Sequence, residues 1–191
     1  MIQQDNVISH LTELAKLPQR GVIGRLNVND LVNKSRGLSY SIDDLGISRV
    51  LGTFPLDALP YGSVYRSFRN SRQEILALFG ADTNIPFSRA VESGVGECLE
   101  KATLLQLAVQ DNMPSFLVNG AMSEGDSLDG YHAFNVVSSS GKPFLVDVQN
   151  PLRKEEAGKL IRPFVAPILG IQNDWFELPE NWKQGRAYYL S

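Results

Sequence analysis

Apolar residues near the start of the chain recur at the spacing of an α-helix. In NVISHLTELAKL they fall at Val7, Leu11 and Leu14, and Pro18 ends the pattern. A second, shorter helix is predicted at NVNDLVNKS. We therefore expect the first part of the chain to be helical and rich in loops.

The next segment combines a weak strand signal with a clear helix. LGTFPLDALPYGSVYRSF contains two prolines and predicts irregular chain, with a short strand at Val64 to Phe68. In SRQEILALFGA, Ser71 can cap a helix, Glu74 follows three residues later, and Gly80 can end it.

The spacing then changes from helical to alternating. ECLEKATLLQLAVQDN is apolar at Cys98, Ala102, Leu105 and Val109, and further apolar residues leave little polar face, which is typical of a buried central helix. Three runs with strand character follow, SFLVNG, YHAFNVVS and KPFLVDVQ. A helix followed by a β-meander predicts an α+β domain with an antiparallel sheet.

The last forty or so residues suggest one more helix and one more strand. LRKEEAGKLI is the helix candidate, and the run from Tyr188 to Leu190 can add a closing strand. We interpret residues 1–191 as one domain, with a helical flank over 1–90, a core over 91–151, and a C-terminal helix and closing strand over 152–191.

Composition and charge narrow the class of protein. The formal net charge is −3 and no block of Lys and Arg occurs, so we expect no nucleic-acid or membrane partner. The first residues lack a signal-peptide pattern. A single cysteine makes no intramolecular disulfide. These features predict a cytoplasmic protein, or one exported by a route that needs no signal peptide.

Cys98 is the one thiol of the chain, and it lies where the central helix should begin. The N–H groups and positive dipole end of a helix N-terminus favour a thiolate, the nucleophilic form. Gly94 and Gly96 allow a tight turn before it. Its own N–H could stabilise an oxyanion. A lone cysteine, however, is more often an inert packed residue.

A nucleophile needs a base, and the chain has two histidines, His10 in the first helix and His132 in a predicted strand. If that strand and the next form a hairpin centred on Ser139 and Ser140, or a longer loop with the same register, His132 faces Asp147 directly. A slip of one residue would put the two on opposite faces. We therefore predict a triad of Cys98, His132 and Asp147.

These segments resemble the transglutaminase-like superfamily of thiol enzymes, which is related to papain. SGVGECLEKATLLQLAVQDNMPSFLVNG, YHAFNVV and FLVDVQNP share its Gly-x-Cys helix start, its helix alanine and proline, and its His and Asp on successive strands. The resemblance places these features on Cys98, Ala102, Pro114, His132 and Asp147. It covers about sixty residues, with Phe134 where tryptophan is common and a leucine after the cysteine.

The resemblance implies acyl transfer through a Cys98 thioester on a protein substrate. We expect no cofactor, and no metal either, because the sequence has no twelve-residue calcium loop. Deamidation or transamidation of glutamine side chains, as in bacterial effectors and toxins, is the leading interpretation. A cysteine protease of the same fold and a non-catalytic binding module are the alternatives. The acyl acceptor, the oligomeric state and the second oxyanion donor stay open; for the last, we considered Gln73, Asn84 and Tyr65.

Overall fold

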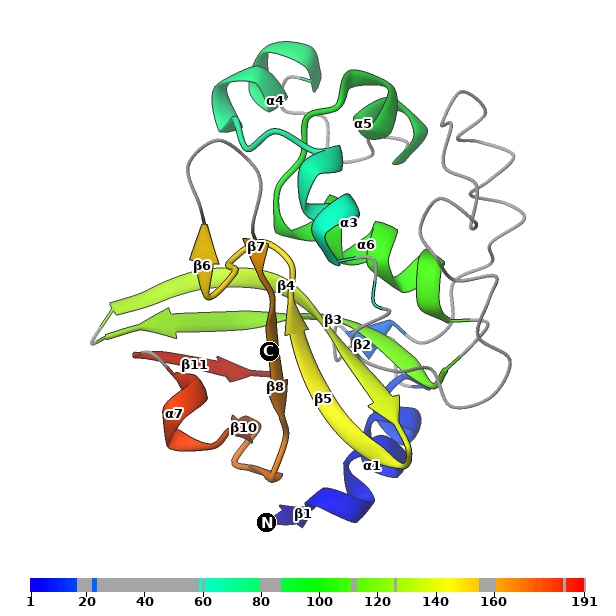
Figure 1. Ribbon diagram of the computed structural model, residues 1–191, viewed down its shortest axis with the longest axis vertical. Coiled ribbons are helices and arrows are strands. Elements are labelled where there is room, and N and C mark those ends of the chain that lie inside the picture. Colours follow the sequence, from blue (N-terminus) through cyan, green and yellow to red (C-terminus); the bar gives the residue numbers. More distant parts are fainter. Residues whose placement is uncertain are drawn as a thin grey trace.

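The predicted α+β class with an antiparallel sheet is confirmed. In the computed structural model, most helices gather on one side of a curved antiparallel sheet (Figure 1). The structure describes residues 1–16, 22–23, 59, 61–79, 87–110, 113–125, 127–154, 161–183 and 185–190. The predicted helix at NVNDLVNKS and the stop at Pro18 lie outside these ranges.

One sheet of nine strands organises the described chain, in the order β1-β9-β10-β11-β3-β4-β5-β8, with β2 also pairing β3. The bounds are β1 Ile2–Gln3, β2 Val22–Ile23, β3 Ser115–Glu124, β4 Ser127–Ser139, β5 Lys142–Asp147, β8 Phe164–Pro167, β9 Gly170–Gln172, β10 Trp175–Glu177 and β11 Arg186–Tyr189. The predicted meander is β3 to β5, and the predicted closing strand is β11, so both are confirmed.

The sheet is strongly curled. Only Ile168 and Leu169 join β8, at one end of the strand order, to β9, near the other end. Because two residues span only a few ångströms, the two ends of the sheet must lie close together. The curl creates an inner face and an outer face, each with its own core.

The inner core is closed by the N-terminal helix. Val7, Leu11 and Leu14 of α1, Val7–Leu14, are buried as the spacing predicts, and they pack with inward residues of the strands, including Phe134 and Tyr188. A single 3-10 turn, η1 Gln4–Asn6, precedes α1.

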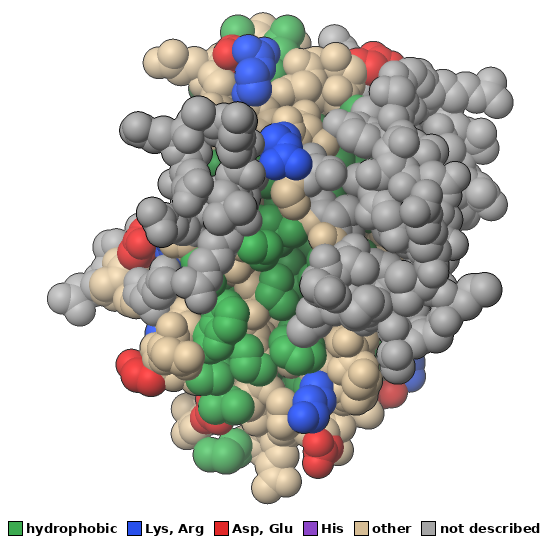
Figure 2. All heavy atoms as spheres, in the orientation of Figure 1, with side chains coloured by type: hydrophobic (Ala, Val, Ile, Leu, Met, Phe, Trp, Pro, Cys, Tyr) green, Lys and Arg blue, Asp and Glu red, His purple; other side chains and the backbone are tan. Residues whose placement is uncertain are grey.

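The outer core lies between the sheet and the other helices. Val137 of β4 and Val146 of β5 pack there with residues of α3 Tyr61–Ser67, α5 Phe87–Ser93 and α6 Cys98–Val109. Where the helices leave the sheet uncovered, hydrophobic side chains gather over β5 and β8 (Figure 2), including half-buried Phe144 and Val165.

Two helix predictions near the outer core have different outcomes. The helix after Ser71 is confirmed as α4, Arg72–Phe79, and the Ser71 hydroxyl accepts a hydrogen bond from the Glu74 N–H at 3.2 Å. The strand predicted at Val64 to Phe68 is wrong, because these residues belong largely to α3. Val64 and Phe68 are four residues apart and both buried, a spacing that one helix face satisfies.

The helix predicted at LRKEEAGKLI is also wrong. Its ends form β6 Arg153–Lys154 and β7 Ile161–Arg162, which pair antiparallel with each other, and residues 155–160 lie outside the described ranges. A propensity without a buried apolar stripe is a weak prior that tertiary pairing overrides. The short C-terminal helix is instead α7, Glu180–Lys183.

The sequence prediction also missed β8, β9 and β10. These strands are only three or four residues long, which leaves little alternation to detect. β9 and β10 are joined by a two-residue turn at Asn173 and Asp174, both with positive φ. Such turns favour Asn and Asp, so the dipeptide was a usable hairpin signal.

No helix within the described ranges is long and apolar enough to cross a membrane.

Candidate active site

Cys98 is the first residue of α6, as predicted. Glu97 is the N-cap, and its N–H donates to Oε2 of Glu100 at 2.9 Å, which satisfies one free donor at the helix start. The first turn of α6 is therefore fixed by a short-range signal in the sequence GECLE. The thiol stands at the end of the helix where unpaired N–H groups accumulate.

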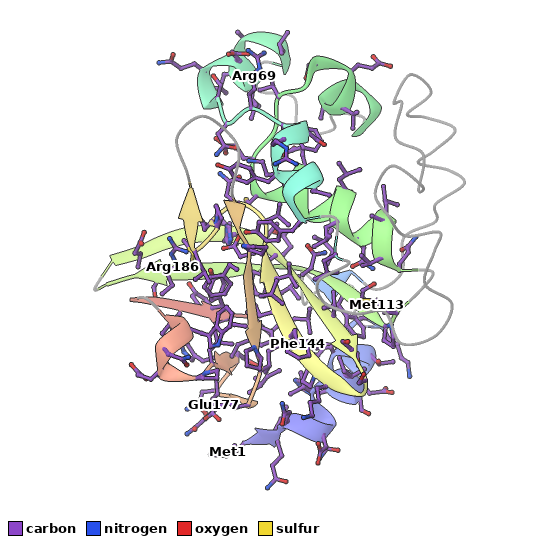
Figure 3. The ribbon with its side chains drawn as sticks, in the orientation of Figure 1. Met1, Arg69, Met113, Phe144, Glu177 and Arg186 are labelled. Atoms are coloured by element: carbon purple, nitrogen blue, oxygen red, sulfur yellow. The ribbon has the colours of Figure 1, made fainter. Side chains whose placement is uncertain are left out.

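The loop before Cys98 is tied to the segment between α3 and α4. The Arg69 N–H donates to the Gly94 carbonyl at 2.8 Å, and the Gly96 N–H donates to the Arg69 carbonyl at 3.2 Å. Arg69 lies beside α4 in Figure 3. A side chain at position 96 would place its Cβ 2.7 Å from Cβ of Glu100, so glycine is needed there for close approach.

Buried polar groups hold α6 on the sheet. Asn135 of β4 donates from Nδ2 to the Ala102 carbonyl at 3.0 Å and to Oε1 of Gln106 at 3.4 Å. Gln106 in turn donates from Nε2 to the carbonyl and the hydroxyl of Ser115 on β3, at 3.1 and 3.0 Å. Asn135 thus anchors the helix that carries Cys98.

Cys98 itself is half-buried. It packs against Ala102 one turn later and against Leu117 and Ala133 of the sheet. The small side chains at 102 and 133 leave room for the thiol between helix and sheet. The Cys98 side chain lies near His132 and contributes to raising the pKa of that imidazole.

His132 and Asp147 meet as predicted, but in a different register. Nε2 of His132 lies 2.8 Å from Oδ2 of Asp147. The ladder pairs Asn135 with Val146 and Ser139 with Lys142, so every partner is displaced by two residues from the prediction. A shift of two keeps all side chains on their faces, and the two residues are diagonal rather than directly opposed neighbours.

The turn between β4 and β5 explains why the observed register differs from the predicted one. The hairpin loop is Ser140 and Gly141, with φ of 52° and 78°. Two positive φ values are characteristic of the type I′ turn, whose twist suits a two-residue hairpin, and glycine adopts them without strain. Ser-Gly was therefore a better turn signal than the Ser-Ser pair one position earlier.

The Asp147 carboxylate is fully buried and accepts five hydrogen bonds. Oδ2 accepts from His132, from the Tyr188 hydroxyl at 2.8 Å and from Nδ2 of Asn150 at 3.1 Å. Oδ1 accepts from the N–H groups of Gln149 and Asn150 at 3.0 and 3.2 Å. An ionised carboxylate can only accept, so this ring of donors matches its charged form.

The pair is held in its ionised state. Burial by itself would raise the pKa of Asp147, but the charge and hydrogen bond of His132, with those of Tyr188 and Asn150, hold it below its usual value. Burial would lower the pKa of His132, but Asp147, aided by Cys98, raises it from 6.5 to about 10. His132 is therefore an imidazolium at neutral pH, beside the thiol.

Two tyrosines complete the buried surroundings. The Tyr61 hydroxyl donates to the main-chain carbonyl of Asp147, and that of Tyr188 donates to its carboxylate. Burial first, and then the charge of Asp147, raises the pKa of both phenols above the ordinary value of 10. Both remain neutral donors at physiological pH. Arg186, beside the β3–β4 hairpin in Figure 3, moderates these shifts.

Sequence reasoning missed Tyr188 and Asn150 as members of the site. Tyr188 was assigned only to a closing strand, and its partner lies 41 residues away, beyond any local pattern. Asn150 had a detectable signal in DVQN, because an Asp side chain often accepts the N–H groups two and three residues later. Gln149 takes part through its main-chain N–H.

Lys101 is a buried cation one turn after Cys98. It is 1% exposed, and its Nζ donates to Oδ1 of Asn70 and, at 2.8 Å, to Oε1 of Gln149. It also lies over the ring of Tyr65, 4.9 Å from the ring centre. Lys101 thus joins the helix of Cys98 to the turn after Asp147.

The three residues considered as the second oxyanion donor lie in different places. Gln73 is exposed on α4, Tyr65 lies beside Lys101, and Asn84 is outside the described ranges. His10, the other histidine, lies half-buried on α1. Among the described residues, no group of three or more His, Cys, Asp or Glu is placed to hold a metal ion.

Sequence comparisons with known proteins find no match, and structural comparison finds a weak similarity. No protein-family model matches the sequence, and no curated protein matches it significantly. A solved structure titled a "Putative Cysteine Protease" from Cytophaga hutchinsonii is similar, with 10% identity and a TM-score of 0.39, over 86% of this chain and 57% of that one. A TM-score this low does not establish a common fold. The three predicted site residues lie together, and their catalytic role stays a prediction.

Proposed function

We propose that this chain is a thiol-dependent amidohydrolase or acyltransferase of the transglutaminase-like type. One observation carries the proposal: Nε2 of His132 hydrogen-bonds the buried carboxylate of Asp147, and the Cys98 side chain lies near enough to His132 to help raise its pKa. A nucleophile, a base and an orienting group in series are what acyl transfer from an amide requires.

The residues have distinct roles in the proposed reaction. The Cys98 thiolate attacks the amide carbonyl, and the N–H at the start of α6 stabilises the oxyanion. His132 gives its proton to the leaving nitrogen, which departs as ammonia or an amine and leaves a thioester. Asp147 fixes the ring and stabilises its charge. Water, deprotonated by His132, then releases the carboxylic acid and the free thiol.

We favour glutamine side chains of proteins as the acyl donor, as the sequence resemblance implies. The overall reaction then converts a glutamine and water into a glutamate and ammonia. An amine in place of water would give transamidation, and a main-chain amide would give proteolysis. An effector or toxin role is part of the same proposal and depends on finding such a target protein.

The test begins with the thiol, because this step needs no substrate. We expect iodoacetamide to alkylate Cys98 rapidly at pH 6, far below the range in which an ordinary thiol reacts well. In His132→Gln this reactivity should fall at least about a hundredfold, the lower end for loss of a positioned base. His10→Gln, which changes the other histidine, should react like the unaltered protein.

A second experiment separates the reactions. Candidate proteins would be incubated with the enzyme and with Cys98→Ala, and analysed for released ammonia, cross-links and fragments. Ammonia with intact protein supports deamidation, whereas fragments would favour the protease. A Cys98 that reacts like a free thiol in all variants would overturn the enzyme proposal and leave the binding module.

A further inference from the structure

Residues on the face of β4 that meets α6 pack against successive turns of that helix. Val137 packs with apolar residues of the second half of α6, including Leu105 and Val109. Asn135, two residues earlier, donates to the carbonyl of Ala102. Ala133, two residues earlier again, packs with Ala102 and Cys98. Each step back along β4 therefore moves the contact toward the start of α6.

The next residue on this face is Tyr131. Side chains two apart on a strand share a face and are separated by about 6.6 Å. Because Ala133 belongs to the cluster against which Cys98, the first residue of α6, packs, we infer that Tyr131 lies one step beyond the start of the helix, near the thiol. The register supports this position, since Tyr131 pairs with Ala121 in an unbroken ladder that also pairs Ala133 with Asn119.

Tyr131 is 84% exposed. A single exposed aromatic residue is ordinary on a protein surface, so exposure alone would mean little. Its position is what matters: Tyr131 directly precedes the candidate base, and exposed Leu99, at 44%, directly follows the candidate nucleophile. The approach to the thiol is thus bordered by apolar side chains that the described fold does not bury.

A β-bulge adds to this arrangement. The β3–β4 ladder shifts register between Met122 and Ser123, next to Gly130, whose φ is 93°. Bulges increase the local twist of a strand and re-aim the side chains beside them, and they are frequent near functional sites. This one lies immediately before Tyr131 and His132.

We propose that Tyr131 is a substrate-contacting residue that selects polypeptides with an apolar or aromatic side chain next to the reacting amide. The inference rests on the proposed function, because it assigns specificity to the same thiol. A ring beside the nucleophile offers a flat apolar surface, and an aromatic side chain packed on it gains about 0.5–1.5 kcal/mol beyond simple burial, or about twofold to tenfold in binding.

The test uses two alkylating reagents of equal chemistry and different size. The rate for N-benzyliodoacetamide is divided by the rate for iodoacetamide, and the ratio is normalised to that of free N-acetylcysteine. We expect a normalised ratio of about 2–10 for the unaltered protein. In Tyr131→Ala it should fall to about 1, with the iodoacetamide rate unchanged, and Tyr131→Phe should keep the preference.

Leu169→Ala is the matched control. Leu169 is 49% exposed, so its loss also removes exposed apolar surface. It adjoins β8 at the end where Pro167 pairs with Phe144, whereas Asp147 is at the other end of β5. The benzyl preference should survive in this variant.

The possible failures are separable. A normalised ratio near 1 in the unaltered protein, or an equal ratio in Tyr131→Ala, overturns the role of Tyr131 and leaves the triad proposal standing. A slow iodoacetamide reaction that His132→Gln does not change overturns the triad proposal instead. The plain reagent reports on the thiol, and the ratio reports on Tyr131.

Discussion

The two halves of the candidate site are held in different ways. Cys98 is half-buried and stands at the start of a helix whose first turn is capped by neighbours within a few residues. Asp147 is fully buried, and the donors around it come from β4, from β11 and from the turn after β5. The start of the helix that carries Cys98 is capped by a local motif, whereas all but one of the side chains that hold Asp147 come from distant strands.

This difference is physically reasonable for a thiol enzyme. A nucleophile must meet substrate, so it needs an open position and few fixed partners. A buried carboxylate, in contrast, must be paired or hydrogen-bonded, because an uncompensated charge in the interior is very costly. Asp147 meets that requirement with five hydrogen bonds, and it keeps His132 protonated beside the thiol. The difference between the two halves of the site leads to four predictions, given in order of decreasing expected effect.

Asp147→Asn should be the most damaging single substitution in the site. The new amide N–H₂ would face groups that are themselves donors, and His132 would lose its counter-charge. Removing one partner from a buried pair costs about 3–5 kcal/mol, which urea denaturation would measure. Glu74→Gln is the control, because Glu74 pairs with Arg69 at the surface and should cost less than about 1 kcal/mol. Equal costs would contradict the buried half as described.

The pH dependence of the free energy of unfolding should report the titration of His132 and Asp147. The pKa of His132 is raised on folding, so its contribution is complete below about pH 6.5 and is lost as the pH rises toward 10. The pKa of Asp147 is lowered, so its contribution is present above about pH 4 and is lost as the pH falls further. Tyr61 and Tyr188 add to the alkaline loss only above about pH 10.

We therefore expect the free energy of unfolding to be greatest between about pH 4 and 6.5 and to decline through the neutral and mildly alkaline range. Denaturation curves at several pH values would measure this decline. In His132→Gln the decline should be much weaker. A stability that is flat from pH 6 to 9 in the unaltered protein would contradict the raised pKa of His132.

Tyr188→Phe and Tyr61→Phe compare two hydroxyls around one residue. Each donates to Asp147, but Tyr188 to the carboxylate and Tyr61 to the main-chain carbonyl. Loss of a hydrogen bond to a charged group should cost about 1.5–3 kcal/mol, and loss of a neutral one about 1 kcal/mol. Only Tyr188→Phe should also raise the pKa of Asp147, because only the Tyr188 hydroxyl donates to the carboxylate, and NMR titration would follow this shift. An equal shift in both variants would show that the hydroxyls act through packing alone.

The sequence predicts the local features of the site better than those that depend on long-range contacts. The start of α6 at Cys98 and the meander of β3 to β5 were predictable, because glycines, caps and alternation are local signals. The hairpin register was two residues off, yet His132 and Asp147 remained on one face since side chains alternate with period two.

The partners of Asp147 were less accessible to such reasoning. Tyr188 reaches the site only because β11 lies beside β3 in the sheet, a pairing between segments more than sixty residues apart. The helix assigned to 152–161 failed for a related reason. Its charged sequence has weak preferences, and long-range pairing decided its structure.

The smallest predicted effect concerns the local half of the site. Glu100 accepts the N–H of Glu97 at the start of α6, so Glu100→Ala leaves that donor without its cap and should cost about 1 kcal/mol. Glu100→Gln retains an accepting oxygen and should restore most of the loss. Urea denaturation gives the stability, and iodoacetamide gives the Cys98 rate. This rate should change by less than about fivefold in Glu100→Ala, which is the equivalent of about 1 kcal/mol. A larger loss of reactivity, with normal stability, would mean that the carboxylate of Glu100 acts on the thiol itself. The reactivity of Cys98 would then depend on a nearby charge, as the ionised state of Asp147 does.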